Sequence, residues 1–397
     1  MLGLLALLYG SSGIVSSSLA PLVTPILRDL DLTKSSMGVI LGSWQFVYLF
    51  WAIPAGAFID RFGLRKALLM GIGFCALSQI LRASAQDYWT LMIAVAVFGL
   101  GNPFMSIGSP KLTSIWFSKA DAGTALGIYS IAPSIGNMLA TSTANSVVMP
   151  LTDYNWRATM LIFGVFTLMS ALAWFLFARD HESSTTSASG PKETFLSASK
   201  HLISLPVIRV ILVMSTCSFL FNHSFNNWLP QMLESKGMTP ADAGFYSAVP
   251  TFIAVFAALF IPRKTSEKWL THVQVLVFAS WALSALLIAF TSGPLAYVGL
   301  VLLGIGRGAS SPLLMLTLLR SPQVGPRLMA AAGGMYFTAG EIGGVLGPTM
   351  TGVFADKTGS FAFGLVLLAT VSGIMALLSF ALRAASRGVR ETEAATG

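Results

Sequence analysis

The sequence has few charged residues for its length. Asp, Glu, Lys and Arg together make up 10% of its 397 residues, whereas apolar residues make up 54% and the mean hydropathy is +0.74. A typical soluble domain carries about 25% charged residues. The composition therefore excludes a soluble globular protein and predicts a membrane protein with many spans.

Cysteine is also scarce, and several chemical motifs are missing from the sequence. The only cysteines, Cys75 and Cys217, both lie in apolar runs, so we expect two buried thiols and no disulfide. The sequence shows no nucleophile–base set, no metal-ligand cluster and no G-x-x-x-x-G-K-[ST] phosphate loop. We therefore expect neither an enzyme nor an ATP-driven pump, and no metal or cofactor.

Long apolar runs, in contrast, are abundant. About 20 apolar residues in a helix cross the hydrocarbon core of a bilayer. The chain offers twelve such runs, at residues 3–27, 37–58, 67–84, 89–114, 123–148, 157–178, 207–232, 241–262, 271–291, 295–318, 329–353 and 360–382. A polar stretch rich in Ser and Thr separates the sixth run from the seventh, as expected of a linker. The predicted fold is an all-α membrane protein with twelve transmembrane helices in two pseudo-symmetric six-helix bundles. The predicted parts are 1–178, the linker 179–206, 207–383 and the tail 384–397.

The second half of the chain repeats the first about 205 residues later. The matching segments are ILRDLDLTKSSMG (26–38) with MLESKGMTPADAG (232–244), GLGN (99–102) with GIGR (304–307), and YSIAPSIG (129–136) with YFTAGEIG (336–343). Repeated halves in an apolar chain are typical of secondary transporters, whose halves move about a central site. The halves differ most where Asn102 matches Arg307 and Ser134 matches Glu341.

The distribution of basic residues predicts the orientation. If the N-terminus is cytoplasmic, 17 of the 24 Lys and Arg residues lie in inner loops and Arg307 alone lies within a span. The other six lie in outer loops: Arg28, Lys34, Arg82, Arg157, Lys236 and Lys357. Cytoplasmic loops carry the excess of Lys and Arg. We therefore expect a multi-pass protein of the inner (plasma) membrane with both termini in the cytoplasm. The net charge of +8 is scattered over short loops, so we expect the lipid bilayer as surroundings and no nucleic acid as a partner.

The loop between the second and third spans carries the strongest motif, PAGAFIDRFGLRKAL (54–68). It resembles the signature loop of the major facilitator superfamily, with the motif residues Gly56, Asp60, Arg61, Gly63, Arg65 and Lys66. Gly56 would permit close helix packing. Asp60 at a helix end can pair with a base on a neighbouring helix, and must release it when the halves rock. The second copy of the loop has Pro262 in place of Asp60. The resemblance covers essentially the whole chain and implies a monomer that works by alternating access.

A weaker resemblance narrows the family. The glycine-rich fourth span leads into PKL and WF, and the seventh ends in WLP. This pattern is similar to the cyanate-permease-like and organic-anion branch of the superfamily. The fifth span contains IAPSIGN (131–137), where the antiporter motif of that family would have glycine at both Ala132 and Asn137. That difference weakens an efflux interpretation.

The resemblance implies that spans 1, 4, 7 and 10 line a central cavity, so polar residues there are candidates for the substrate site. Arg307 leads them, because an arginine near the bilayer centre costs roughly 2.5–3.5 kcal/mol. Such a cost is tolerated when the guanidinium faces a wet cavity and binds an anion through its planar fork. The predicted substrate-binding residues are Arg307, Asn102, Asn222, His223, Asn226, Asn227 and Tyr336.

Glu341 is the carboxylate that lies clearly inside a span, and two roles compete for it. It could be the proton-coupling residue, which binds a proton when a substrate anion occupies Arg307. It could also be a static counter-ion of Arg307, or serve packing alone.

These features predict a secondary active transporter of a small organic or inorganic anion, monocarboxylate-like or cyanate-like, coupled to protons. The alternative is proton-driven efflux of a drug or metabolite. A third possibility is a non-transporting membrane sensor on the same scaffold. The expected partners are a small-molecule anion as substrate and the proton as coupling ion.

Overall fold

The structure is a computed structural model that describes residues 1–118, 122–179, 195–321 and 323–396. All regular structure in these ranges is helical, with no strand, which confirms the predicted all-α fold class. Residues 180–194 of the predicted linker lie outside the described residues. Contacts divide the chain into two compact units: Met1–Ala188 with Phe225–Phe252 and Pro348–Gly359, and Ser189–Ser224 with Ile253–Gly347 and Ser360–Gly397.

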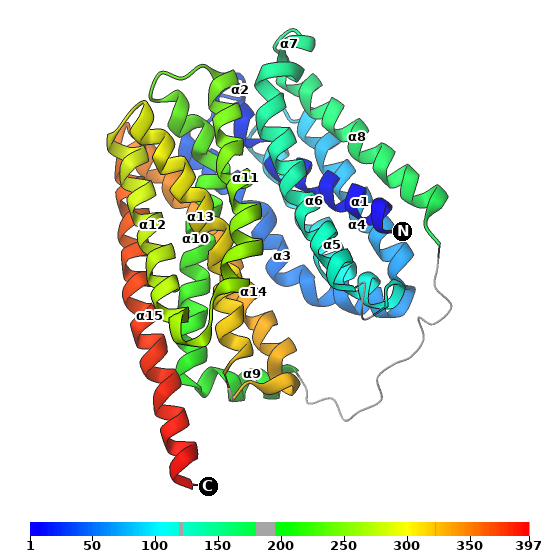
Figure 1. Ribbon diagram of the computed structural model, residues 1–397. Coiled ribbons are helices and arrows are strands. Elements are labelled where there is room, and N and C mark those ends of the chain that lie inside the picture. The colour runs from blue at the N-terminus through cyan, green and yellow to red at the C-terminus, as the bar shows by residue number, and fades with distance from the viewer. Residues whose placement is uncertain (119–121, 180–194, 322, 397) are drawn as a thin grey trace. The chain divides into compact units, whose positions relative to one another are not determined.

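The described residues before the linker form ten helical elements, of which α1 to α8 are labelled in Figure 1. They are α1 (Leu2–Ser17), η1 (Ala20–Leu22), α2 (Val23–Asp29), α3 (Lys34–Phe62), α4 (Leu64–Ala83), α5 (Tyr88–Trp116), α6 (Ala122–Thr143), η2 (Ala144–Val148), α7 (Met149–Leu151) and α8 (Trp156–Phe177). All of them belong to the first unit.

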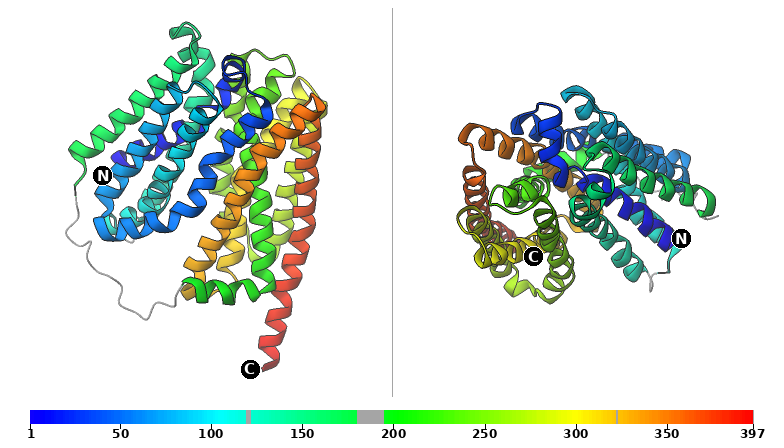
Figure 2. Two further views of the ribbon diagram at one scale, coloured as in Figure 1. Left: turned by 180° about the vertical axis from the view of Figure 1, so that it is seen from behind. Right: turned by 90° about the horizontal axis from the view of Figure 1, so that it is seen from above.

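The remaining elements follow the linker. They are α9 (Phe195–Ser204), α10 (Pro206–Glu234), α11 (Pro240–Lys264), η3 (Glu267–Trp269), α12 (Leu270–Phe290), α13 (Pro294–Leu319), α14 (Gly325–Thr358) and α15 (Ala362–Thr396). The short α9 runs across the direction of the long helices of its unit, as Figures 1 and 2 both show. The unit boundaries fall inside α10, α11 and α14, so each of these helices contributes to both units.

Ten of the helical segments in the described residues are long and apolar enough to cross a membrane. They coincide with ten of the twelve predicted runs. The other two runs, 123–148 and 329–353, are occupied by α6 with η2 and by α14. The helix pattern is therefore that of the predicted twelve-helix membrane fold.

The first span, predicted over 3–27, is interrupted in the structure between α1 and α2. The α-helix ends at Ser17, and Pro21 in the following turn has no N–H to donate. Carbonyl groups released inside a membrane need new donors. Asn145 Nδ2 donates to Pro21 O at 2.8 Å, and Gln231 Nε2 donates to Ala20 O at 2.7 Å. Side chains from distant parts of the sequence thus stabilise the break.

Arg82 also supports the break, and its predicted place in an outer loop is wrong. It lies in the last turn of α4, its side chain is 1% exposed, and Nη1 donates to Val15 O at 2.7 Å. The same atom reaches Ser18 Oγ at 3.3 Å and Gln79 Oε1 at 3.4 Å. Carbonyls at a helix C-terminus carry partial negative charge that favours a cation. Arg82 is therefore, like Arg307, an arginine within a span, but Arg82 is buried whereas Arg307 is partly exposed.

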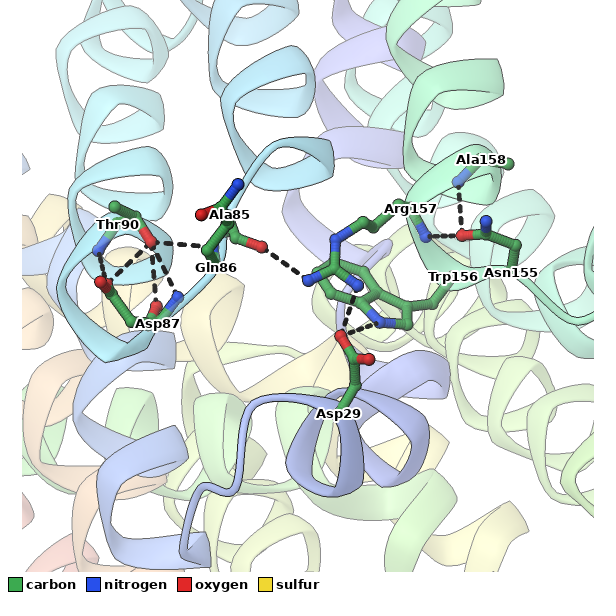
Figure 3. Close-up of polar contacts among 9 residues, drawn as sticks. All are labelled: Asp29, Ala85, Gln86, Asp87, Thr90, Asn155, Trp156, Arg157 and Ala158. Atoms are coloured by element: carbon green, nitrogen blue, oxygen red, sulfur yellow. Dashed lines mark hydrogen bonds and ion pairs between the residues drawn. The ribbon is translucent and has the colours of Figure 1, made fainter.

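Arg157 ties together three connections of the first unit (Figure 3). Its guanidinium forms an ion pair with Asp29, donates from Nη2 to Ala85 O at 2.8 Å, and lies 4.3 Å from the centre of the Trp156 ring. Trp156 Nε1 donates to the same Asp29 carboxylate at 3.2 Å. One side chain at the start of α8 thereby holds the ends of α2 and α4.

Glycines set the helix crossings, and they do so at matching places in the two copies of the repeat. A Cβ on Gly136 of α6 would collide with the Gly10 carbonyl of α1, and a Cβ on Gly343 of α14 would collide with the Thr216 carbonyl of α10. Backbones approach this closely only where one residue has no side chain. The internal repeat therefore extends from the sequence to the packing.

Candidate functional site

Arg307 lies in the middle of α13, and neighbouring helices pack closely against the glycine on either side of it. The Trp281 ring of α12 packs against Gly306, and the Ala254 backbone of α11 packs against Gly308. A Cβ atom on either glycine would collide with these groups. Successive helix residues are turned by about 100°. The two glycines therefore fix the rotation of α13, and the side chain of Arg307 projects between these two contacts.

The guanidinium of Arg307 lies close enough to His223 of α10 to act electrostatically on its imidazole. The rings of Phe219 and His223 are 5.9 Å apart, so an aromatic residue flanks the imidazole one turn away. Asn222 donates from Nδ2 to Ser218 O at 3.0 Å and remains partly exposed. The second unit thus gathers a cation, an imidazole and an amide at one level of α10 and α13.

Tyr336 holds three helices of the second unit together. Its side chain is 0% exposed, and its hydroxyl donates to Ser311 Oγ of α13 at 3.0 Å. Ser215 Oγ of α10 donates to the Tyr336 carbonyl at 2.7 Å. The Phe219 ring lies 6.0 Å away in an edge-on arrangement. These contacts position α10, α13 and α14 around the predicted site.

Glu341 is buried in α14, with 7% of its surface exposed. Its Oε2 atom has no hydrogen-bond partner, and the residue forms no ion pair with any residue in the described ranges, Arg307 included. An ionised carboxylate is costly to bury without a partner. The arrangement does not contain the static Glu341–Arg307 pair that the sequence left as one possibility.

The other predicted substrate residues lie in the first unit. Asn226 Oδ1 accepts from Asn137 Nδ2 of α6 at 2.9 Å. Asn227, the next residue of α10, is 4% exposed. Asn102 is partly exposed on α5 beside Pro103. Arg307, Asn222, His223, Tyr336 and Glu341 belong to the second unit, and the boundary between the units falls inside α10, between Ser224 and Phe225.

The signature loop between α3 and α4 is built around Asp60. Its Oδ1 atom forms an ion pair with Lys111 Nζ of α5 at 2.6 Å, and both side chains are exposed. The sequence predicts that Asp60 can pair with a base on a neighbouring helix, and in the structure that base is Lys111 of α5. Gly63 adopts a φ of +85°, which favours glycine, and allows α4 to begin directly after α3.

The basic residues of the loop differ in their contacts. Arg65 donates from Nη2 to Phe175 O at 3.0 Å, and Trp174 Nε1 donates to Arg65 O at 3.0 Å, so Arg65 fastens α4 to α8. Arg61 lies 5.2 Å from the centre of the Phe62 ring, and Lys66 is exposed. The close packing expected at Gly56 is wrong for this structure, because a Cβ there would meet no described atom within 4 Å.

Sequence comparison identifies relatives along the whole chain. The model of the family described as the Major Facilitator Superfamily matches residues 5–348. The chain is 21% identical to a hexuronate transporter of Bacillus subtilis, with 94% of this chain and 91% of the relative covered. It is 25% identical to a putative tartrate transporter of Agrobacterium vitis, covering 93% and 86%. It is 24% identical to a D-galactonate transporter of Escherichia coli, covering 91% and 90%.

Solved structures show the same fold. A nucleoside transporter superposes with a TM-score of 0.80 at 16% identity, covering 96% of this chain and 99% of that one. A bacterial homologue of the human lysosomal transporter Spinster, in an inward-facing and unoccupied conformation, gives a TM-score of 0.79 at 16% identity, covering 97% and 96%.

Proposed function

Because this chain belongs to the Major Facilitator Superfamily, we propose that it is a secondary transporter of a small hydroxylated organic acid that works by alternating access. The relatives described above are named for hexuronate, tartrate and galactonate. All three anions carry at least one carboxylate and at least two hydroxyl groups. This chemistry narrows the wider class of small anions that the sequence predicts.

Arg307 is the proposed carboxylate-binding residue. A guanidinium offers two parallel N–H donors that match the two oxygens of a carboxylate. Asn222, His223, Asn226 and Asn227 of α10, with Asn102 of α5, would serve the hydroxyl groups, since amides and imidazoles both donate and accept. Tyr336 would act by positioning α13 and α14, because its hydroxyl is already bonded to Ser311.

Glu341 is the proposed proton-coupling residue, and its burial without a hydrogen bond or ion pair among the described residues is the observation that carries this proposal. A carboxylate in this setting can take up a proton without breaking an ion pair. When an organic anion occupies Arg307, the added negative charge favours a proton on Glu341. Anion and proton would then cross the membrane in the same direction.

The same proposal includes the membrane arrangement. The excess of Lys and Arg in alternate loops supports cytoplasmic termini by the positive-inside rule. The protein would lie in the plasma membrane as a monomer. The ion pair of Asp60 with Lys111 would then face the cytoplasm, where it joins the ends of α3 and α5.

The test is flux into proteoliposomes under an imposed pH gradient, with labelled D-galactonate, tartrate and glucuronate as probes. We expect uptake of at least one probe by the intact protein, loss with Arg307→Ala, and partial retention with Arg307→Lys. Arg209→Ala removes an exposed arginine of α10 and serves as the matched control. Glu341→Gln should retain exchange of the anion while losing pH-driven accumulation.

Two results would overturn the proposal. Normal transport by Arg307→Ala would exclude the guanidinium as the anion site. Transport of cationic or neutral drugs without any organic acid would favour the efflux alternative.

A further inference from the structure

A polar stripe runs along one face of α6 and its continuation η2. Asn137, Thr141 and Asn145 follow one another at intervals of four residues, and residues so spaced share a helix face. Each contacts α10 or α11 within the first unit. The contacts join Asn137 to Asn226 at 2.9 Å, the Thr141 carbonyl to the position where Gly244 has no Cβ, and Asn145 Nδ2 to the Pro240 carbonyl at 3.3 Å.

Asn137 is the centre of this stripe, because its amide joins four helices. Its Nδ2 atom donates to Ser17 Oγ at the end of α1 and to Asn226 Oδ1 of α10. Its Oδ1 atom accepts from Thr251 Oγ1 of α11 at 3.4 Å. Asn137, Ser17 and Thr251 are 8%, 0% and 4% exposed, whereas Asn226 is partly exposed. One buried amide therefore connects Asn226 to the break in the first span.

The chemistry of the stripe suits a contact that forms and dissolves repeatedly. Hydrogen bonds between amides, hydroxyls and carbonyls can be exchanged for bonds to water at little net cost. At Gly244 the backbone of α11 approaches the Thr141 carbonyl of α6 closely. Because glycine has no side chain, no interlocked side chain hinders the separation of the two helices there. Asn145 lies at the far end of the stripe and also donates to Pro21 O in the broken first span. An apolar stripe of the same length would expose apolar surface to water on opening, which is unfavourable, and it would form no new hydrogen bonds with water.

From these contacts we propose that Asn137 is a positioning residue that couples occupancy of Asn226 to opening of the α2–α3 end of the first unit. In the closed arrangement described by the structure, Asn226 is held by Asn137. A substrate hydroxyl that competes for Asn226 loosens the Asn137 amide from α10, and the contacts of Thr141 and Asn145 can then separate in turn. The proposal rests on the transport function proposed above only for the identity of the competing ligand.

The first experiment needs no substrate. Ser247 of α11 is 5% exposed and lies one turn beyond Gly244, so Ser247→Cys reports opening in a background with Cys75→Ser and Cys217→Ser. The rate of labelling by a hydrophilic maleimide is measured in nanodiscs. We expect Asn137→Ala to raise this rate about three- to tenfold, as the loss of one hydrogen bond allows. Ser146→Ala, an exposed neighbour of the stripe, is the matched control and should leave the rate unchanged.

A double-mutant cycle separates coupling from general loosening. Asn226→Ala should raise labelling to a similar extent, and the variant with both substitutions should exceed neither single variant by more than about twofold, because both remove one interaction. Asn137→Ser, which is smaller and still polar, guards against misfolding of the alanine variant and should lie between the intact protein and Asn137→Ala. Unchanged labelling in Asn137→Ala, or fully additive effects of the two substitutions, would overturn the proposal.

Transport of D-galactonate provides the second readout. For a positioning role, Asn137→Ala should change the maximal rate by more than it changes KM, whereas Asn226→Ala should raise KM. Equal loss of both parameters in Asn137→Ala, without altered labelling, would indicate a merely structural residue. If galactonate is not transported but labelling responds as expected, the substrate assignment fails and the coupling role of Asn137 stands.

Discussion

Arg82 in α4 of the first copy and Arg307 in α13 of the second copy both lie within membrane-spanning helices, and the two differ in their surroundings. Arg82 of the first copy is 1% exposed and donates to a backbone carbonyl, a hydroxyl and an amide oxygen. Arg307 of the second copy lies between Gly306 and Gly308, which pack against neighbouring helices, and its charge acts on the imidazole of His223. The first arginine completes a broken helix, whereas the second is placed beside groups able to bind a ligand. A buried arginine therefore indicates function only when its partners are known.

The cations at the ends of the fourth and tenth spans give a second contrast between the copies. Lys111 forms an ion pair with Asp60 at 2.6 Å. Arg320, at the end of the tenth span in the second copy, donates from Nη2 to the Thr265 carbonyl at 3.3 Å. The second copy keeps the cation and replaces the carboxylate by a backbone carbonyl. Of these two contacts, only the one between Asp60 and Lys111 depends on two opposite charges.

The largest expected effect separates the two arginines by activity. Arg307→Ala should lower the transport rate by at least about 100-fold, since charged hydrogen bonds of roughly 1.5–3 kcal/mol each are lost. Arg82→Ala should retain the rate within about twofold when the rate is counted per folded molecule. Proteoliposome flux, normalised to folded protein by size-exclusion chromatography, measures both. A loss in Arg82→Ala as large as in Arg307→Ala would break the comparison.

Stability should show the reverse order. Arg82→Ala leaves Val15 O and its neighbours without their charged donor, which costs roughly 1.5–3 kcal/mol, so the apparent melting temperature in detergent should fall by several degrees. Gln79→Leu, which removes one acceptor of the same cluster, should cause a smaller fall. Arg307→Ala should leave the melting temperature unchanged or raise it, because a charge within a membrane span is removed. A large fall in Arg307→Ala would give that residue a structural role as well.

The ion pair of Asp60 with Lys111 and the contact of Arg320 with the Thr265 carbonyl should differ by a smaller factor in their effect on the transport rate. Asp60→Asn and Lys111→Met should each reduce transport about tenfold, and exchange of the two charges in Asp60→Lys with Lys111→Asp should restore part of it. Arg320→Met should reduce transport by about threefold at most, since its carbonyl partner is neutral. Initial rates of flux measure the difference. Equal losses in Asp60→Asn and Arg320→Met would show that both copies use the contact in the same way.

The smallest expected effect concerns the starts of α3 and α11. Asp356 accepts from the backbone N–H of Lys34 at 3.1 Å and of Ser35 at 2.6 Å, whereas at α11 Thr239 donates to Asp242 of its own first turn at 2.7 Å. Burial alone would raise the pKa of Asp356, but hydrogen bonds from Ser35 and Lys34 outweigh it and lower the pKa below its usual value. Its stabilising effect is therefore complete above about pH 4 and is lost as the pH falls through the lowered value.

Melting temperatures at pH 7, 5 and 3 test this contrast. Asp356→Asn should melt a few degrees below the intact protein at pH 7 and 5, and the difference should shrink at pH 3. Asp242→Asn, the counterpart at α11, serves as the matched comparison. A deficit in Asp356→Asn that is constant down to pH 3 would mean that the charge of Asp356 contributes nothing.

Much of the architecture could be predicted from local sequence, because hydropathy and length are properties of each segment alone. The runs of apolar residues correspond to the observed helices. The repeat aligns Gly136 with Gly343, but it does not show which helix packs against each of these glycines. The position of Asp60 at a helix end correctly suggested a basic partner. The identity of that partner could not be predicted, since Lys111 is 51 residues away.

The candidate site divides in the same way. Arg307 and Glu341 stand out in the sequence because a charge within an apolar run is expensive wherever the run lies in the bilayer. Asn137 does not stand out, since an amide in a span acquires a role only through the helices that surround it. Its replacement of an expected glycine was the one available signal, and it pointed to no partner.

By itself the sequence determined the class of the molecule, the order of its helices and the two charges that the second copy carries within the membrane. Tertiary structure decided what each buried charge does. Arg82 could be mistaken for a loop residue because its position near the end of an apolar run is locally ambiguous. The backbone carbonyl that stabilises it, Val15 O, belongs to a helix more than 60 residues earlier in the chain. Burial is costly for any charge, and only the assembled helices determine whether backbone groups, side chains or a bound anion offset that cost.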